Sequence, residues 1–248
     1  MSGVRRELTI ERVVPGGAGL ARVDGAVTLV GGALPGDTVL AEPRPDGPRL
    51  LRADALAVVA AGPHRRPAGE VCPLAADGRC GGCDWPAARL ESHPALKTEL
   101  VLDALRRIGR VPDAELPTPR FVASPRKYRL RSRFRWDGRS ALGFLGRASS
   151  RVADVEACEV VTDALLARLP AVRSALAASG APECELQLLE GSGGAPLLGE
   201  LRFDGALPAA DGVAAALHGP LDGVRVVARG RVAAARGPSF LHLEAGGA

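Results

Sequence analysis

Four of the five cysteines are spaced as ligands of a metal centre. Cys80 and Cys83 are separated by two glycines, Cys72 precedes them, and Cys158 lies far downstream. Glycines between two thiolates let the backbone curl toward one centre and direct its amide N–H groups at sulfur. Four thiolates bind either tetrahedral zinc or an iron–sulfur cluster. The pattern therefore predicts a metal site made of Cys72, Cys80, Cys83 and Cys158.

The grouping of these cysteines favours a 4Fe–4S cluster over zinc. Zinc sites usually contain two close pairs of ligands, whereas three cysteines here are close together and the fourth is remote. A zinc site and ordinary buried thiols remain the alternatives. Cys184, within Glu-Cys-Glu on an expected strand, is interpreted as a structural thiol.

A run of alternating arginines forms the second candidate site. Side chains along a strand point to opposite faces in turn, so the segment 127–136 would have one basic and one apolar face. The basic face would present side chains about 6–7 Å apart, a spacing that suits the phosphates of a nucleic acid. The expected RNA-binding residues are Lys127, Arg129, Arg131, Arg133 and Arg135. The alternative is a solvated strand that acidic neighbours neutralise.

Positive charge is concentrated in the same part of the chain. The net charge is only +4, but residues 118–151 contain ten basic residues and one acidic residue, Asp137. A basic patch on a mildly acidic body predicts a polyanionic partner, and nucleic acid is the usual one. Five of the eight aromatic residues fall here, and core packing explains them better than base stacking: Phe121, Tyr128, Phe134, Trp136 and Phe144.

The elements that must position these residues fall into three expected segments. Residues 1–62 contain short apolar stretches split by Gly, Pro and Asp turns, which is typical of a small antiparallel barrel of the OB type. Asp24-Gly25 predicts a two-residue hairpin turn. Residues 63–116 comprise a linker, the cysteine-rich loop and a helix over 93–109, capped by Ser92. The apolar face of that helix would contain Leu96, Leu100, Val101, Leu105 and Ile108.

Residues 117–248 predict an α+β domain. Strands are expected at 128–136, 140–145, 183–190, 197–203 and 224–228, with helices from about 162 to 179, interrupted at Pro170, and around 212–218. The fold class is therefore a multi-domain α+β protein. Gly16–Gly19 and Gly191–Gly194 are interpreted as turns, because neither has the strand–turn–helix context of a cofactor loop.

Length and composition exclude several classes of protein. A chain of 248 residues that is 46% hydrophobic and 24% charged can bury a core, which excludes wholesale disorder. No apolar run approaches the roughly 18 residues of a membrane span, and the N-terminus lacks the apolar stretch of a signal peptide. We therefore expect a cytoplasmic protein with reduced thiols and no membrane partner.

Several of these segments together resemble the RNA (uracil-5-)-methyltransferase family. The glycine and aspartate turns of the barrel, at 17–21, 24–27 and 35–37, resemble a TRAM domain, which is a small RNA-binding barrel. Cys72-Pro73 with Cys80–Trp85 and the following helix resembles the iron–sulfur region of the family. Tyr128-Arg129-x-Arg131 and Asp154-Val155-x-x-Cys158 resemble the start of its central domain and its fourth cluster ligand. The resemblance covers residues 4–165, and 166–245 loosely.

The resemblance implies methyl transfer from S-adenosylmethionine to C5 of a uridine in rRNA or tRNA. In the family, a later Rossmann-like domain binds S-adenosylmethionine and carries the nucleophilic cysteine and the base, and these have no counterpart in this sequence. We therefore expect the RNA-recognition portion of such an enzyme, inactive alone, with a catalytic domain lost or encoded separately. No catalytic or S-adenosylmethionine-binding residue is assigned.

One departure from the family and one alternative function remain. Seven residues lie between Cys72 and Cys80, where the family has about five, and a loop insertion could absorb the difference. The alternative is a stand-alone TRAM-type RNA-binding protein with a structural 4Fe–4S or zinc site.

Overall fold

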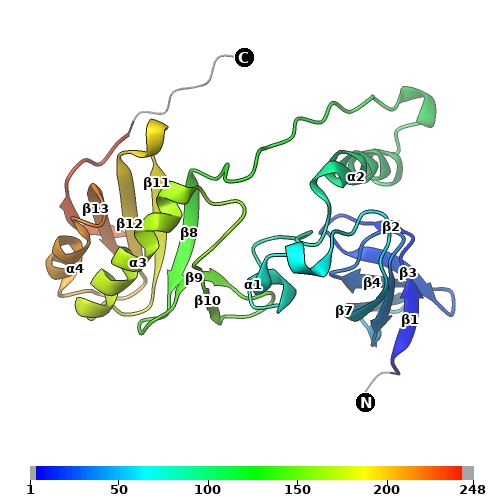
Figure 1. Ribbon diagram of the computed structural model, residues 1–248, viewed down its shortest axis with the longest axis horizontal. Coiled ribbons are helices and arrows are strands. Elements are labelled where there is room, and N and C mark those ends of the chain that lie inside the picture. Colours follow the sequence, from blue (N-terminus) through cyan, green and yellow to red (C-terminus); the bar gives the residue numbers. More distant parts are fainter. Residues whose placement is uncertain (1–3, 242–248) are drawn as a thin grey trace. The chain divides into compact units, whose positions relative to one another are not determined.

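The computed structural model describes residues 4–241, which form two compact units. Unit 1 contains residues 1–76 and 83–123, and unit 2 contains residues 77–82 and 124–248. Each unit is built on its own β-sheet, and a few helices accompany each sheet (Figure 1). The expected α+β class is therefore confirmed. Among the described residues, no helix is long and apolar enough to cross a membrane.

The sheet of unit 1 is curled, with the strand order β1-β5-β7-β4-β3-β2, and β6 pairs with β7. Its strands are β1 (Arg6–Thr9), β2 (Arg12–Val13), β3 (Gly19–Val23), β4 (Ala26–Gly31), β5 (Thr38–Ala41), β6 (Arg44–Pro45) and β7 (Leu50–Ala60). Buried side chains from these strands fill its interior, including Leu8, Val30 and Val39. The long strand β7 joins the two halves, since its first residues pair with β4 and its last residues with β5.

The expectation of a purely antiparallel barrel is wrong at one pair, because β4 and β7 run parallel. The short strand β6 and the start of β7 form an antiparallel hairpin, with Arg44 opposite Arg52. The start of β7 therefore lies between β6 and β4, and it runs parallel to β4. The Asp24-Gly25 hairpin is confirmed. Both residues have positive φ, 49° and 80°, which is the conformation that a type I′ turn requires.

Asp37 joins the sheet of unit 1 to the segment expected to be a linker. Its carboxylate is fully buried and accepts hydrogen bonds from the backbone N–H groups of Leu34, at 2.7 Å, and Gly62, at 2.8 Å. Arg65 donates to both carboxylate oxygens, with Nη2 at 2.7 Å from Oδ2, and also donates to the carbonyl oxygen of Gly32. The segment after the barrel is therefore held firmly against it.

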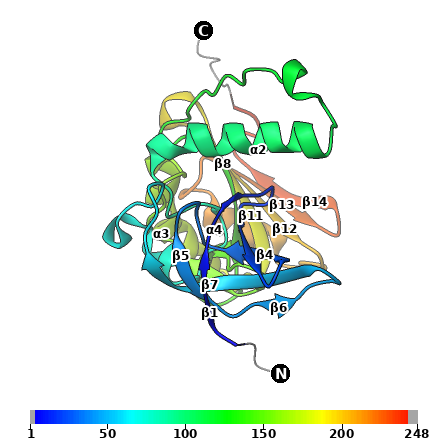
Figure 2. The same ribbon diagram turned by 90° about the vertical axis from the view of Figure 1, so that its right-hand side faces the viewer.

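Helix α2 (His93–Arg107) packs over one end of the curled sheet (Figure 2). Leu96 is buried against Val13, Leu34 and Ala88, with Leu100 beside them, whereas the expected face residues Val101 and Ile108 are exposed. The expected cap is also wrong. Ser92 makes no side-chain capping hydrogen bond, because it ends a 3₁₀ turn (Leu90–Ser92) in helical conformation. The remaining short helical elements are α1 (Pro73–Ala76) and the 3₁₀ turns Ala68–Glu70, Asp113–Glu115 and Ser192–Gly194.

The sheet of unit 2 has the strand order β10-β9-β8-β11-β12-β13-β14. Its strands are β8 (Arg131–Trp136), β9 (Leu142–Leu145), β10 (Val152–Asp154), β11 (Cys184–Glu190), β12 (Leu197–Phe203), β13 (Gly223–Ala228) and β14 (Arg231–Arg236). Neighbours are antiparallel except β12 and β13. The loop from β8 to β9 is shaped by Asp137, whose carboxylate accepts hydrogen bonds from three backbone N–H groups.

Helices α3 (Asp163–Ala178) and α4 (Ala210–Leu217) cover one face of this sheet (Figure 1). The expected break at Pro170 is wrong, because α3 continues through it. A proline inside a helix costs about 3 kcal/mol. Burial of apolar side chains on both sides of it, about 1.5–3 kcal/mol each, outweighs that cost. These side chains are Leu165, Leu169, Val172 and Leu176. The opposite face of the sheet is therefore the one that can meet a ligand.

Candidate nucleic-acid interface and metal ligands

The alternation predicted for the basic strand is confirmed over β8. Ser132, Phe134 and Trp136 are buried on the face that the helices cover. Arg131 and Arg133 are exposed on the opposite, uncovered face, and Arg135 is half-buried there. Tertiary packing of the aromatic residues thus fixes which way the arginines point.

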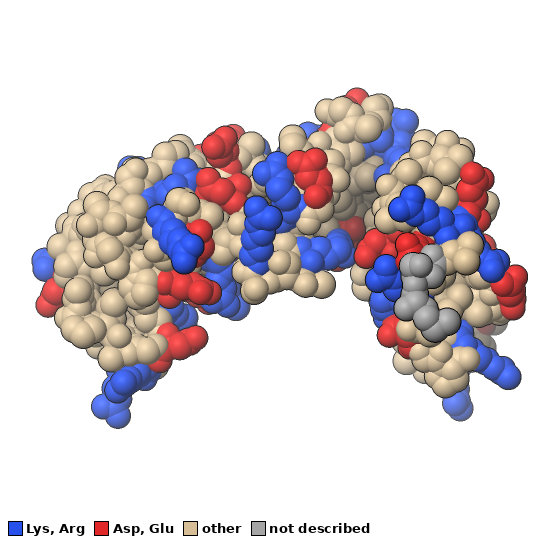
Figure 3. Space-filling model, turned by 90° about the horizontal axis from the view of Figure 1, so that it is seen from below, with Lys and Arg blue, Asp and Glu red and all other residues tan. Residues whose placement is uncertain are grey.

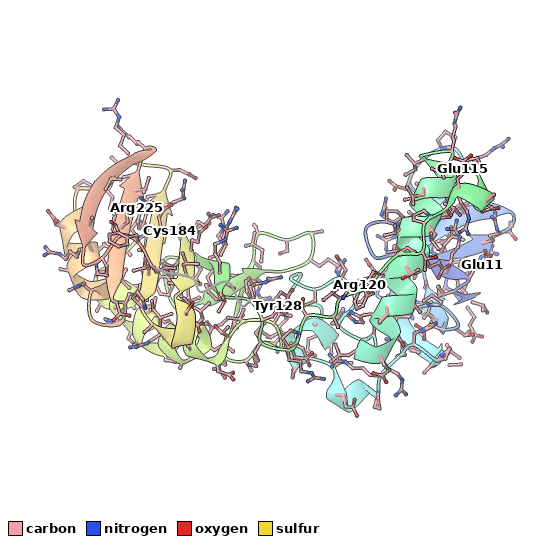
Figure 4. The ribbon with its side chains drawn as sticks, turned by 90° about the horizontal axis from the view of Figure 1, so that it is seen from above. Glu11, Glu115, Arg120, Tyr128, Cys184 and Arg225 are labelled. Atoms are coloured by element: carbon pink, nitrogen blue, oxygen red, sulfur yellow. The ribbon has the colours of Figure 1, made fainter. Side chains whose placement is uncertain are left out.

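Acidic residues on neighbouring strands neutralise part of this face. Arg135 lies opposite Glu185 of β11 and forms an ion pair with it at 3.4 Å. Farther across the sheet, the buried carboxylate of Glu200 on β12 contacts Arg202 at 2.5 Å and Arg225 on β13. Arg225, on β13, and Cys184, on β11, are labelled in Figure 4 and locate this part of the sheet. The solvated-strand alternative therefore applies to Arg135.

Arg131 and Arg133 differ from Arg135. Within residues 4–241, neither guanidinium has an ion-pair or hydrogen-bond partner, since the residues opposite them on β11 are Leu189 and Gln187. Two exposed guanidiniums without counter-charges therefore remain on the uncovered face.

Lys127 and Arg129 lie outside the strand, because β8 begins at Arg131. Lys127 has a positive φ of 58° and its Nζ forms an ion pair with Asp163 at 2.8 Å. The backbone of Arg129 forms a parallel bridge with Val161. The five predicted RNA-binding residues therefore form two groups, an uncovered strand face and the segment that leads into it.

Tyr128 corrects the expectation that the aromatic residues of this region pack inward. Phe134 and Trp136 do so: the Phe134 ring stacks on Phe144 at 5.0 Å between centroids, and Trp136 Nε1 donates to the carbonyl oxygen of Ala181 at 2.8 Å. Tyr128, however, is 46% exposed. The alternating pattern predicts a strand from residue 127, but β8 begins at Arg131, so the alternation of faces does not apply to Tyr128.

Charge over the rest of the surface is mixed. In the view of Figure 3, basic side chains stand beside acidic ones in both units. This matches the ion pairs in each unit, such as Arg52 with Asp46 and Arg173 with Asp154. Arg131 and Arg133 differ from these paired arginines because they have no counter-charge among the described residues.

The four predicted metal ligands are divided between the units: Cys72 and Cys83 belong to unit 1, and Cys80 and Cys158 to unit 2. All four are half-buried thiols that form no disulfide. Trp85, two residues after Cys83, anchors its segment by donating Nε1–H to the carbonyl oxygen of Gly17 at 2.9 Å. Cys158 lies in the loop between β10 and α3.

The glycines beside Cys80 have the predicted local role. The Gly82 N–H points at Cys80 Sγ, with 3.4 Å between the two atoms. The Gly81 N–H donates to the carbonyl oxygen of Leu145 on β9, and a Cβ at Gly81 would lie 2.9 Å from the backbone of Arg147. Only glycine therefore fits this approach of the cysteine loop to β9.

Among the described residues, no group of three or more His, Cys, Asp or Glu side chains is arranged to hold a metal ion. The donor chemistry of the four cysteines suits a cluster, because the set offers four thiols and a backbone N–H directed at one sulfur. Cys184 is buried at the start of β11, and this burial raises the pKa of its thiol to about 12, as expected for a structural residue.

Neither glycine-rich segment forms a cofactor loop. Residues 16–17 form the turn between β2 and β3, and residues 191–194 join β11 to β12, so both connect two strands, as predicted.

No protein-family model matches the chain. It is 33% identical over 203 residues to the 23S rRNA (uracil(1939)-C(5))-methyltransferase RlmD of Halomonas elongata, an alignment that covers 78% of this chain and 40% of that protein. It is 31% identical over 217 residues to the protein of the same name from Pseudomonas entomophila, covering 84% of this chain and 46% of that protein. The chain therefore spans less than half the length of these relatives.

A solved structure has a similar fold. The crystal structure of Pyrococcus abyssi tRNA (uracil-54, C5)-methyltransferase, in complex with S-adenosyl-L-homocysteine, superposes with a TM-score of 0.59 at 17% sequence identity. The match covers 96% of this chain and 57% of that protein.

Proposed function

We propose that this chain is the RNA-recognising part of an RNA (uracil-C5)-methyltransferase that uses S-adenosylmethionine as methyl donor. The observation that supports this best is the uncovered face of β8, where Arg131 and Arg133 are exposed without counter-charges among the described residues. The relatives and the solved structure carry the names of uracil-C5 methyltransferases of rRNA and tRNA, which supports RNA as the polyanion.

Binding at this face rests on charge and geometry. A guanidinium offers a fork of donors to phosphate oxygens and stays protonated at all physiological pH values. Alternate residues of one strand hold such groups about 6–7 Å apart on a backbone that the hydrophobic core fixes. Arg131 and Arg133 would therefore contact neighbouring phosphates, while Arg135 would act less strongly because Glu185 competes for it.

Lys127 and Arg129 would extend the RNA track from the strand face into the preceding segment. Lys127 must exchange its partner Asp163 for phosphate, so its contribution is smaller than that of an unpaired cation. We also propose the cytoplasm as location, since rRNA and tRNA are modified there.

The double variant Arg131→Gln/Arg133→Gln tests this function. Each phosphate contact on single-stranded RNA contributes about 0.7 to the slope of log affinity against log salt. Loss of two contacts should therefore make the slope about 1.4 less steep and weaken binding about 25-fold near 0.1 M salt. Arg168→Gln, on the exposed side of α3, is the matched control and should bind as the unmodified protein does. An unchanged slope in the double variant would overturn the assignment.

For the cysteines, we propose that Cys72, Cys80, Cys83 and Cys158 hold a 4Fe–4S cluster with a structural role. When bound, such a cluster would supply a rigid inorganic cross-link between cysteines that are distant in sequence. Half-burial of the four thiols and the N–H directed at Cys80 Sγ support this proposal. Zinc is the competing occupant, and metal analysis decides between them.

A further inference from the structure

We propose that the ring of Tyr128 is a stacking platform for an unpaired base of the bound RNA. The inference rests on the proposed function, because it places a base-binding residue beside the phosphate-binding arginines. Tyr128 is the only tyrosine of the chain, and it lies in the segment that leads into β8, outside the sheet (Figure 4).

The ring is exposed on a backbone that hydrogen bonds hold in place. The N–H of Lys127 donates to the carbonyl oxygen of Glu159 at 2.9 Å, and the N–H of Arg129 donates to that of Val160 at 2.8 Å. Both residues flanking Tyr128 are thus tied to the loop between β10 and α3. An exposed aromatic side chain on a fixed backbone loses little freedom when a ligand stacks on it, so the site is preorganised.

The chain geometry beside the ring is unusual. Lys127 has φ of +58°, a conformation that residues other than glycine rarely adopt. It forms a turn with Arg126 immediately before Tyr128, so the segment turns here instead of continuing β8 backward. Residues held in sparsely populated backbone conformations cluster at functional sites, and this one directly precedes the exposed ring.

Cations next to the ring can bind the phosphates on either side of a stacked base. The Arg129 guanidinium carbon lies 6.0 Å from the Tyr128 ring centroid, at the outer limit of a cation–π contact. Arg131 follows two residues later on the uncovered strand face. An aromatic platform within a basic track is the arrangement by which proteins bind single-stranded nucleic acid.

The ligand class follows from accessibility of the base. Bases in an RNA duplex are stacked on one another and expose only their edges, so a ring on the protein surface cannot reach their faces. Unpaired loop nucleotides expose their faces, and their stacking on an aromatic side chain tolerates any base. The expected ligand is therefore a loop or single-stranded segment.

The test compares Tyr128→Ala with Tyr128→Phe on an unstructured RNA oligonucleotide and on an RNA duplex. Tyr128→Ala should weaken binding of the single strand about 5- to 150-fold, with the salt slope unchanged, because stacking releases no counterions. Tyr128→Phe should bind nearly as the unmodified protein does, because it keeps the ring. Binding of the duplex should be unchanged in both variants. A 2-aminopurine in the oligonucleotide should be quenched on binding, and Tyr128→Ala should abolish that quenching.

The outcomes separate the two proposals. If the unmodified protein binds the oligonucleotide with a steep salt slope but Tyr128→Ala binds equally well, base stacking is refuted and RNA recognition stands. If Tyr128→Ala, melting at the unmodified temperature, weakens single strand and duplex equally, the ring has another role, such as contact with a protein partner, and the inference fails. If the unmodified protein binds neither RNA, the proposed function itself fails.

Discussion

At the scale of single residues, burial separates the cysteines into two kinds. Cys184 is buried in the core of unit 2, where loss of hydration raises the pKa of its thiol to about 12, so a thiolate does not form there at neutral pH. The other four are half-buried in loops or at their edges. A metal centre requires thiolates, and the four loop cysteines therefore suit the role better.

This difference yields a prediction for metal loading. After anaerobic reconstitution with iron and sulfide, the protein should contain about four irons per chain and absorb broadly near 400 nm. Cys83→Ser should lose most of this iron, whereas Cys184→Ala should retain it, because Cys184 is outside the ligand set. Iron and sulfide analysis of both variants is the measurement. Full iron in Cys83→Ser would refute that ligand, and stoichiometric zinc in place of iron would favour the zinc alternative.

At the scale of elements, one buried carboxylate holds the curled sheet to the segment that follows it. Asp37 is fully buried and its charge is matched by Arg65 and by two backbone N–H groups. Breaking a buried pair leaves an uncompensated charge and is far costlier than breaking a surface pair. The stability of unit 1 should therefore depend strongly on this pair.

We expect Asp37→Ala to lower the free energy of unfolding by about 3–5 kcal/mol, since Arg65 and two N–H groups lose their acceptor. Asp46→Ala removes an exposed pair with Arg52 and should cost less than about 1 kcal/mol. Urea denaturation of the two variants checks the contrast. Equal losses of stability would contradict the expectation that the buried Asp37–Arg65 pair stabilises the protein more than the exposed Asp46–Arg52 pair does.

The same elements show how far sequence patterns reach. The hairpin at Asp24-Gly25 and strand β12 could be predicted from local sequence. A two-residue hairpin turn requires residues that tolerate positive φ, and a short apolar run between turns is typical of a buried strand. The Arg131–Arg135 alternation was equally predictable. The start of β8, the unbroken α3 and the role of Arg65 were not, because each depends on contacts with residues distant in sequence. The same holds for the exposure of Tyr128.

At the scale of the whole molecule, the chain contains two sheets and the candidate RNA-binding residues lie in the second. The alignments with the relatives named as rRNA methyltransferases cover 40% and 46% of those proteins. Within residues 4–241, the two glycine-rich segments are turns between strands. The proposal that this chain is the RNA-recognising part of a methyltransferase implies that it does not transfer methyl groups alone.

This expectation can be measured directly. The chain of residues 1–248, incubated with radiolabelled S-adenosylmethionine and unmodified rRNA or tRNA, should bind RNA but incorporate no methyl label above background. A methyltransferase acting on the same RNA is the positive control. Incorporation of label into uridine would show that residues 1–248 contain an active site and would contradict the proposal that this chain is only the RNA-recognising part of the enzyme.

The contact between Arg65 and Asp37 has a practical consequence for dissecting the protein. A fragment that ends at residue 62 would keep the buried carboxylate of Asp37 but lose the Arg65 guanidinium that pairs with it. It would also lose Ala88 and Leu96, which cover Val13 and Leu34. Extending the fragment to the end of α2 restores both the cation and the apolar lid. The smallest piece of unit 1 worth expressing therefore ends near Gly109, well beyond the last strand of the sheet.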